Sequence, residues 1–288
     1  MILVGTASWA DPSLVRSGWY PEGCRSAEDR LRYYASQFPL VEVDSTYYFP
    51  PRPDVVHAWT ARTPEDFTFD VKAFSLLTQH PTNPDALPEG GAPEGKARVY
   101  LKDVEAGVVD EVWDRFLSAL QPLRRAGKLG ALLFQFPPWF ILNGANKTYV
   151  LECARRAEPF RICVEFRNPI WTAEENLEET TALLERAGIA YVIVDMPQEL
   201  KGAIPAVAMV TSKQLAVVRL HGRNRQGFEA KSFQGLTEYH YTRAELEAWA
   251  SKLQALREQA EVVHVVFRNA HADYAVRNAA ELQRLLAG

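Results

Sequence analysis

The stretch RICVEFRNPIW, residues Arg161–Trp171, begins as a β-branched run and ends in charged residues before Pro169. This pattern predicts a short buried strand. Because alternate residues of a strand share a face, Glu165 and Arg167 are expected to point to the same side. An acid and a guanidinium on one face, at the carboxyl end of a strand, indicate a candidate site.

Seven further segments have the composition of strands, and helical or loop segments separate them. The predicted strands besides the one that holds Glu165 are Ile2–Ser8, Leu40–Asp44, Phe67–Lys72, Gly130–Phe136, Ala190–Asp195, Leu215–His221 and Val262–Asn269. The predicted helices are Ala27–Phe38, Asp54–Arg62, Asp110–Arg125, Lys147–Ala157, Ala173–Ala187, Thr242–Gln259 and Asp273–Leu286.

Strand–helix alternation of this kind implies a parallel sheet, since each parallel return needs a crossover. Eight units within 288 residues match a closed (β/α)8 barrel of TIM type, with residues 1–288 forming a single domain. An open doubly wound sheet is the alternative. The segment Gly5-Thr6-Ala7-Ser8 at the end of the first strand is neither a dinucleotide-binding nor a phosphate-binding glycine loop, which disfavours that alternative.

Residues 73–109 differ from the rest of the chain because proline and glycine punctuate them and no periodicity persists. We expect a long loop excursion from the C-terminal face of the barrel, since such loops within compact domains are usually functional or mobile. Residues 196–214 carry no clear pattern. A basic loop is predicted over Gly222–Phe233, with Arg223, Arg225 and Lys231.

Composition and charge are those of an ordinary soluble globular protein. The chain is 47% hydrophobic and 24% charged, with a net charge of −4, which disfavours a nucleic-acid-coating surface. Three widely spaced cysteines fit no zinc or redox spacing and suggest buried thiols in a reducing compartment. The N-terminus lacks the features of a signal peptide, and no apolar run is long enough to cross a bilayer. We therefore expect a cytoplasmic protein with no membrane association.

Short motifs along nearly the whole chain resemble the YecE-like family, a domain of unknown function. They are Val4-Gly5-Thr6, Trp19-Tyr20-Pro21, Val41–Tyr48, Thr63-Pro64, Phe67–Phe69 with Lys72, Leu133–Pro138, Val164–Arg167, Arg219–Gly222 and Phe267–Asn269. The chain departs from the family pattern at Asp44, where Asn is usual, at Asn168, where His is frequent, and at Gln79, which separates Thr78 from His80. The resemblance implies a TIM-type barrel and brings no established activity, so function must be argued from the site.

Active sites of such barrels lie at the C-terminal face, on strand ends and the loops that follow. Polar groups at the predicted strand ends therefore form the candidate site. The candidate catalytic residues are Glu165, Glu42 and His221, and the candidate substrate-binding residues are Lys72, Arg167, Arg219, Asn269, Asp195, Trp9, Tyr47 and Trp171. A polar network that only fills the barrel is the structural alternative, although packing alone favours Val, Ile and Leu in this layer.

Three classes of function fit these residues. The first is a metal-independent enzyme that acts on a small anionic or sugar-like substrate. Here Lys72, Arg167 and Arg219 bind the anion, Glu165 or Glu42 serves as the general base, and His221 is its acid/base partner. Aromatic side chains at the same end suit sugars or bases by stacking, unless they cap the mouth as core. No cofactor is predicted under this hypothesis.

The second class is a metal-dependent isomerase or nuclease, in which Glu165, Asp195 and His221 hold a divalent ion. Two nearby arginines disfavour it because they repel a cation. The third class is a non-enzymatic binding module, for single-stranded nucleic acid or another ligand, which the net charge disfavours. The sequence thus favours a small-molecule substrate and leaves the oligomeric state open.

Overall fold

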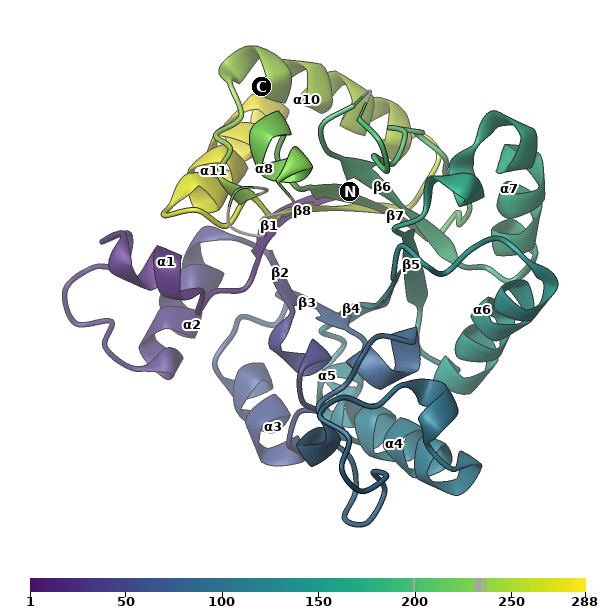
Figure 1. Ribbon diagram of the computed structural model, residues 1–288. Helices are drawn as coiled ribbons and strands as arrows, with labels where there is room; N and C mark the ends of the chain where they lie inside the picture. Colours follow the sequence, from purple (N-terminus) through teal and green to yellow (C-terminus); the bar gives the residue numbers. More distant parts are fainter. Residues whose placement is uncertain (199, 231–234, 236) are drawn as a thin grey trace.

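The computed structural model describes residues 1–198, 200–230, 235 and 237–288. Its parallel strands close into a barrel in the order β1 to β8, with helices around the outside (Figure 1). This confirms the predicted (β/α)8 barrel of TIM type. The strands are β1 Ile2–Ala7, β2 Leu40–Val43, β3 Thr68–Lys72, β4 Leu129–Phe136, β5 Ile162–Phe166, β6 Ala190–Asp195, β7 Leu215–Leu220 and β8 Val262–Phe267.

The seven predicted helical segments are helical, with differences at their ends, and the short α-helices Pro12–Arg16 and Arg225–Glu229 form where no helix is predicted. The α-helices are α1 Pro12–Arg16, α2 Ala27–Gln37, α3 Pro53–Ala61, α4 Ala106–Ala119, α5 Gln121–Arg125, α6 Gly144–Ala157, α7 Leu177–Arg186, α8 Arg225–Glu229, α10 Arg243–Arg257 and α11 Tyr274–Ala287. The 3-10 helices are η1 Ser45–Tyr47, η2 Ser75–Thr78, η3 Pro84–Ala86, η4 Leu101–Asp103, η5 Pro169–Thr172 and η6 Glu174–Asn176.

The helix predicted over Asp110–Arg125 is in fact two helices, α4 and α5, which meet at Leu120. Pro122 explains the break, because proline has no N–H to donate and is tolerated only in the first turn of a new helix. Helix α1 lies in a segment expected to be a loop. Its start is fixed by Asp11, whose carboxylate accepts hydrogen bonds from the N–H groups of Ser13 and Leu14.

Alternate residues of the strands fill two separate apolar layers. The inner layer lies within the barrel and includes Ala131, Leu133, Cys163, Ala190, Val192, Val194, Leu215 and Val217. The outer layer joins the remaining strand residues to the helices and includes Leu132, Phe134, Val164, Ile193 and Val218. The parity of each strand residue therefore decides whether its side chain faces the barrel interior or the helices.

One polar pair interrupts the inner layer. Asp70 of β3 and His264 of β8 are both buried, and Nδ1 of His264 lies 2.9 Å from Oδ2 of Asp70. The two side chains meet against Gly130 of β4. A Cβ at Gly130 would stand 2.7 Å from Cε1 of His264 and closer still to Oδ1 of Asp70, so only glycine leaves room for the pair.

The segment between β3 and α4, residues 73–105, consists of η2, η3 and η4 joined by loops and by one isolated bridge between Thr82 and Val99. Its residues Asp85–Pro88 lie near α4, where they line a groove of about 410 Å³ with Val112 and Arg115. The inward end of the segment is buried, including Thr78 and His80, and this part approaches the barrel mouth.

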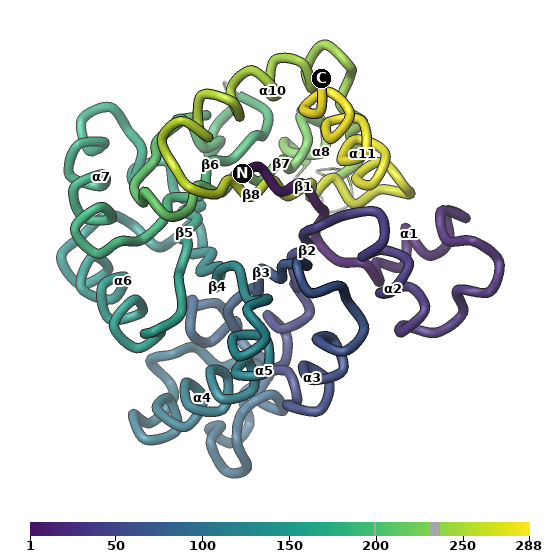
Figure 2. Tube along the Cα trace, turned by 180° about the vertical axis from the view of Figure 1, so that it is seen from behind, coloured from purple at the N-terminus to yellow at the C-terminus, as the bar shows by residue number. Residues whose placement is uncertain are grey.

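Seen from the opposite end of the barrel, the N-terminus lies beside the start of β8 (Figure 2). The amino group of Met1 donates a hydrogen bond of 2.8 Å to the carbonyl of Glu261, which joins the first and last strands at this end. Within the described part of the chain, none of the helices combines the length and the apolar character needed to span a bilayer.

Candidate active site at the C-terminal mouth of the barrel

Arg219 lies at the centre of a buried ionic network. It faces the interior from β7, beside Val194 of β6, and is fully buried. One nitrogen, Nη1, contacts Oε2 of Glu165, and Nη2 donates a hydrogen bond of 2.6 Å to Oε1 of Glu42. Although burial lowers the pKa of Arg219, Glu165 and Glu42 more than compensate and raise it. Arg219 thus neutralises two buried carboxylates at once.

Glu165 binds a second cation on its other oxygen. Arg167 follows β5 directly and continues its ladder, with its N–H donating to the carbonyl of Phe136 at 3.2 Å. Its Nε forms an ion pair with Oε1 of Glu165, while 21% of its side chain stays exposed. Burial raises the pKa of Glu165, but Arg167 and Arg219 outweigh it and hold that pKa well below its usual range. Glu165 is therefore a fixed anion and a poor general base.

His221 stands next to this pair. It continues β7, because its N–H donates to the carbonyl of Asp195 at 2.9 Å. Its ring nitrogens lie 3.4 and 3.5 Å from Nη2 of Arg167, and Nε2 lies 3.5 Å from Oε1 of Glu165. Burial and the charge of Arg167 hold the pKa of His221 well below its usual range, so the imidazole is neutral.

Lys72, at the end of β3, lies in the same region and is buried. Its Nζ lies 4.3 Å from the centre of the Tyr47 ring, and no oxygen among the described residues accepts a hydrogen bond from it. Burial lowers the pKa of Lys72 to about 7, helped by Arg268 and Arg219 and opposed by Glu42 and Glu165. A substantial part of Lys72 is therefore the neutral amine at neutral pH.

A row of rings borders Lys72. The ring of Tyr47 packs edge-on against Tyr48 at 5.1 Å and against His80 at 5.3 Å, and His80 packs against Trp139 at 5.8 Å. Tyr48 and Trp139 end the row in solvent, with 62% and 55% of their surfaces exposed. Burial, with Lys72 and Arg167, lowers the pKa of His80 to about 4, so this ring is also neutral.

Several cationic side chains lie close together at the mouth of the barrel. Burial, with Arg268 and Arg219, lowers the pKa of Arg167 to about 10 against the attraction of Glu165. Burial also lowers the pKa of Arg268, and Arg219 adds to the effect. Neighbouring cations at the mouth thus disfavour one another's positive charge.

A cavity of about 810 Å³ opens beside Arg167. Its walls come from the loops after β4, β5 and β6 and from α8: Pro138, Arg167, Asn168, Pro169, Leu200, Lys201, Gly202, Phe228 and Glu229. Most of this lining is apolar, and Arg167 and Lys201 supply its positive charges. The cavity has the size of a small-molecule site.

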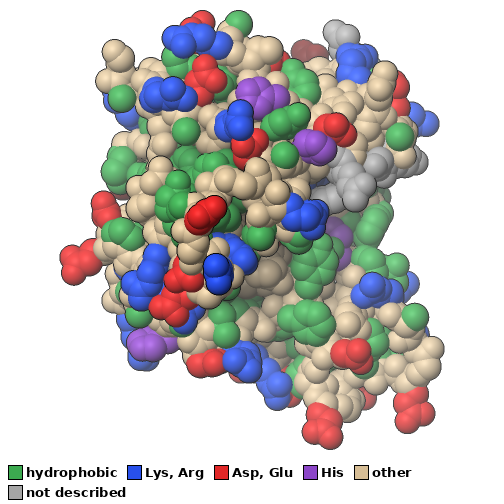
Figure 3. Space-filling view, turned by 90° about the vertical axis from the view of Figure 1, so that its left-hand side faces the viewer, with side chains coloured by type: hydrophobic (Ala, Val, Ile, Leu, Met, Phe, Trp, Pro, Cys, Tyr) green, Lys and Arg blue, Asp and Glu red, His purple; other side chains and the backbone are tan. Residues whose placement is uncertain are grey.

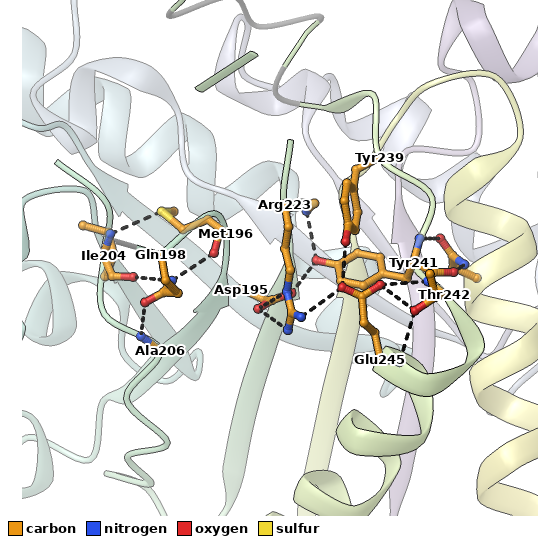
Figure 4. Close-up of polar contacts among 12 residues, drawn as sticks. Asp195, Met196, Gln198, Ile204, Ala206, Arg223, Tyr239, Tyr241, Thr242 and Glu245 are labelled. Carbon is orange, nitrogen blue, oxygen red and sulfur yellow. Dashed lines mark hydrogen bonds and ion pairs between the residues drawn. The ribbon is translucent and has the colours of Figure 1, made fainter. Parts of the chain in front are cut away.

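The structure separates Asp195 from the network at the mouth, contrary to our expectation. Its neighbour across the sheet is Leu220, which belongs to the outer core, so Asp195 faces the helices. Its carboxylate accepts two bonds of 2.9 Å from Arg223 and one of 2.7 Å from the hydroxyl of Tyr241. Figure 4 shows this second network, which continues from Arg223 to Glu245 at the start of α10.

Three other expected site residues, Trp171, Trp9 and Asn269, also face outward. Trp171 stacks on Phe166 with ring centres 3.9 Å apart and donates to the carbonyl of Phe140. Trp9 packs in the outer core, edge-on to Trp59 at 5.7 Å. For both tryptophans, packing as core is what the structure supports.

Asn269 likewise faces away from the mouth. Its amide donates at 2.7 Å to the carbonyl of Tyr239 and at 3.0 Å to Asn278, and so ties the end of β8 to the segments around α10 and α11. Its neighbour Arg268 takes the inward place instead, with its N–H donating to the carbonyl of Leu220 at 2.8 Å. Sequence reasoning missed Arg268 and His80. The alternation Phe267, Arg268, Asn269 could have revealed the former, because Phe267 packs outward.

The three ligands of the alternative metal site are consequently not gathered. Glu165 and His221 adjoin, but Asp195 serves the outer network. In the portion of the chain that the structure describes, no group of three or more His, Cys, Asp or Glu is placed to hold a metal ion.

The predicted basic loop does not form a cluster of free cations. Arg223 pairs with Asp195, and Arg225 donates to the carbonyl of Gln198 at 3.2 Å. Lys231 lies outside the described residues. On the side of the molecule drawn in Figure 3, acidic and basic side chains intermingle, in keeping with the small net charge.

Comparison with known proteins places the chain in a family. Over residues 3–288 it matches the family described as "Protein of unknown function DUF72". It is 30% identical to the UPF0759 protein YunF of Bacillus subtilis over a 291-residue alignment that covers 99% of this chain and 95% of YunF. It is 27% identical to the UPF0759 protein YecE of Escherichia coli O157:H7, with 84% of this chain and 83% of YecE covered.

Solved structures of members of the same family have a similar fold. The barrel is similar to a crystal structure of a DUF72 family protein from Enterococcus faecalis V583, with a TM-score of 0.82, 27% identity and coverage of 100% of this chain and 96% of that one. It is also similar to a DUF72 family protein from Thermotoga maritima MSB8, with a TM-score of 0.79, 28% identity and full coverage of both chains. The YecE-like resemblance is thereby confirmed, and the chain belongs to the DUF72 (UPF0759) family of proteins of unknown function.

Proposed function

We propose that this chain is an enzyme that acts on a small anionic substrate by acid/base chemistry at the C-terminal mouth of the barrel. The position of Arg167 carries the proposal. Its Nε pairs with Glu165, its Nη2 lies 3.4 Å from the neutral ring of His221, and the residue lines the cavity of about 810 Å³. A guanidinium held in this way can offer two parallel donors to a carboxylate or a phosphate.

The surrounding charges support an anion as the bound group. Lys72, Arg167 and Arg268 all have lowered pKa values, to which neighbouring cations contribute. Both oxygens of Glu165 are occupied by arginines, so this acid adds little attraction for a further cation. A bound anion relieves the repulsion among the basic groups, whereas a divalent cation increases it.

The acid/base roles differ from those expected from sequence. Glu165, fixed between two guanidiniums, is unsuited to take up a proton. Lys72, with its pKa lowered to about 7, suits proton transfer near neutral pH. Neutral His221, beside Arg167, is placed to exchange a hydrogen bond with a ligand there.

The cavity walls favour a substrate with an apolar portion. Pro138, Pro169 and Phe228 line the cavity together with Arg167. A ligand with its anionic group on Arg167 extends along these side chains and buries apolar surface, which strengthens its binding.

Phosphate binding tests the proposal, with phosphate as the probe. Bound phosphate should raise the melting temperature, and the stabilisation should grow with the logarithm of one plus the ratio of the phosphate concentration to Kd. Arg167→Gln removes the charge and should weaken phosphate binding by about tenfold or more, since hydrogen bonds to charged groups contribute about 1.5–3 kcal/mol. Arg243→Gln, at an exposed arginine of α10, is the matched control and should bind phosphate as the wild type does. Equal affinities for Arg167→Gln and the wild type would refute the proposed site.

A further inference from the structure

Lys72 is an unusual buried lysine. It ends β3 on the inward face, only 6% of its surface is exposed, and none of the described residues supplies an oxygen to its Nζ. A buried ammonium without a partner costs several kcal/mol, so such a group is normally paired or neutral. The surroundings of Lys72 therefore favour the amine over the ammonium, and the amine is the nucleophilic form.

The groups that face Lys72 come from strands on several sides of the barrel. Arg219 of β7 and Arg268 after β8 oppose its charge, and Glu42 of β2 and Glu165 of β5 favour it. Both carboxylates are already engaged by Arg219. The ring of Tyr47 covers one side of the amine, and His80 packs against that ring.

A second buried lysine provides an internal comparison. Lys128 precedes β4, at the other end of the barrel strands, and is 5% exposed. Its Nζ donates to the carbonyls of Thr60 and Thr63 and to the Thr63 hydroxyl, at 2.7 to 3.1 Å. Three acceptors satisfy all three protons of an ammonium. The surroundings of Lys128 thus stabilise an ammonium. Lys72 has no such acceptor among the described residues, so its ammonium is not stabilised in this way.

From this contrast we infer that Lys72 is a catalytic nucleophile that forms an imine with the substrate, so that the substrate is a small aldehyde or ketone that carries an anionic group. The inference rests on the proposed function, because Arg167 is to hold the anionic group. A lysine that is buried next to another cationic group is activated as a nucleophile, because more of it is the neutral amine.

The chemical step needs no bound cofactor. The lone pair of Nζ forms a bond to the carbonyl carbon while the π pair of the carbonyl moves to oxygen, and a proton passes from nitrogen to that oxygen. With one further proton from solvent, the hydroxyl leaves as water while the nitrogen lone pair forms the C=N bond. The protonated imine then accepts the electron pair of a C–H bond at the adjacent carbon, whose proton passes to water, and an enamine forms. Reprotonation of that carbon restores the protonated imine, and addition of water then releases the carbonyl compound and restores the amine.

Reductive trapping tests the inference on the wild-type chain. Pyruvate, a ketone with a carboxylate, and acetone, a neutral ketone, are each incubated with the protein and cyanoborohydride. Reduction of the imine adds the mass of the ketone less its oxygen atom, and peptide mapping locates the adduct. We expect pyruvate to label Lys72 and leave Lys128 unlabelled, and to reach half-maximal labelling at a concentration about tenfold lower than acetone does.

The pH dependence gives a second readout. Labelling of Lys72 should rise with pH and level off above a midpoint near 7, where the amine is neutral. An acetylated lysine amide in solution should show its midpoint near 10.4 instead. Lys72→Met should lose the adduct, and Lys102→Met, at an exposed position, should keep it.

The two proposals fail in different ways. If phosphate binds but neither ketone labels Lys72, the imine inference is overturned and the anion site stands. If acetone labels Lys72 with a midpoint near 7 while phosphate does not bind and pyruvate has no advantage, the lysine nucleophile stands and the anionic substrate is overturned. Labelling of Lys72 no faster than that of exposed lysines also overturns the inference.

Discussion

Glu165 and Arg167 lie two residues apart on the inward side of β5, and their side chains form an ion pair through Oε1 and Nε. The other oxygen of Glu165 contacts Arg219, which is completely buried. One carboxylate thus joins a cation of the barrel interior to a cation at the mouth. Since the two arginines differ in exposure, their contributions to folding and to binding can be separated by mutation.

Arg219→Met should be strongly destabilising. The substitution keeps the side-chain volume roughly constant but leaves Glu42 without its partner and Glu165 with one fewer. Leaving buried charge uncompensated typically lowers the free energy of unfolding by about 3–5 kcal/mol. Urea unfolding followed by circular dichroism measures the loss. Arg243→Met, at an exposed ion pair, is the control and should change stability by less than about 0.5 kcal/mol. Similar urea midpoints for the two variants would contradict the buried network.

Arg167→Gln should cost less stability than Arg219→Met. Glu165 retains Arg219 in this variant, and the Arg167 side chain is 21% exposed, so water can replace part of its contact. We expect the free energy of unfolding to fall by about 1.5–3 kcal/mol, the range for a hydrogen bond to a charged group. The same urea experiment measures it. A loss as large as that for Arg219→Met would show that the mouth arginine is mainly structural.

Glu165 should also make stability depend on pH. Its folded-state pKa lies below the ordinary value of 4.5, so the ionised acid stabilises the fold above that pH. As the pH falls below 4.5 and through the folded pKa, protonation removes this contribution. The stability gap between the wild type and Glu165→Gln should therefore be largest near neutral pH and shrink in acid. Urea unfolding at several pH values measures it, and a constant gap would be the contrary result.

Much of this network follows from sequence because strand parity is regular. Glu165 and Arg167 share a face by their spacing, and so do Arg219 and His221. The structure brings these four together because β5 and β7 end at the same level of a closed barrel. What the spacing cannot give is which oxygen pairs with which nitrogen. That pairing depends on side-chain positions across the barrel, as in the 2.6 Å contact from Arg219 to Glu42.

The outward residues were misplaced for a physical reason. β6 is buried on both faces, so its sequence is continuously apolar and gives no alternation that marks the inner side. The position of Asp195 at the end of a strand is then the only cue in the sequence, and it predicts a place at the mouth. In the structure Val192 and Val194 hold the inward positions, so Asp195 faces outward. The sequence also does not predict that Lys72 lacks a hydrogen-bond acceptor among the described residues. Whether an acceptor is present depends on which side chains the neighbouring strands place near its Nζ.

Gly130→Ala should destabilise the barrel interior. The added Cβ would lie 2.7 Å from Cε1 of His264 and would also meet Asp70, and both side chains are fixed by their mutual contact. Overpacking of this kind usually costs about 1–3 kcal/mol. Gly107→Ala, in the first turn of α4, is the matched control, since nothing lies within 4 Å of its added Cβ. Thermal melts compare the two, and equal melting temperatures would mean that the pair can move apart.

Asp195→Asn should lower the stability of the fold without changing phosphate binding, because Asp195 belongs to the outer network and not to the site at the mouth. Asp195 accepts hydrogen bonds from Arg223 and Tyr241, and the loss of its charge weakens the attachment of the β7–α10 connection to the barrel. We expect the free energy of unfolding to fall by about 1–3 kcal/mol. Phosphate affinity should stay at the wild-type level, because Asp195 faces the helices and Arg167 faces the cavity. Thermal-shift titration with phosphate checks this. An affinity that falls as far as in Arg167→Gln would show that Asp195 acts at the mouth and would revive the alternative in which it joins Glu165 and His221 around a metal ion.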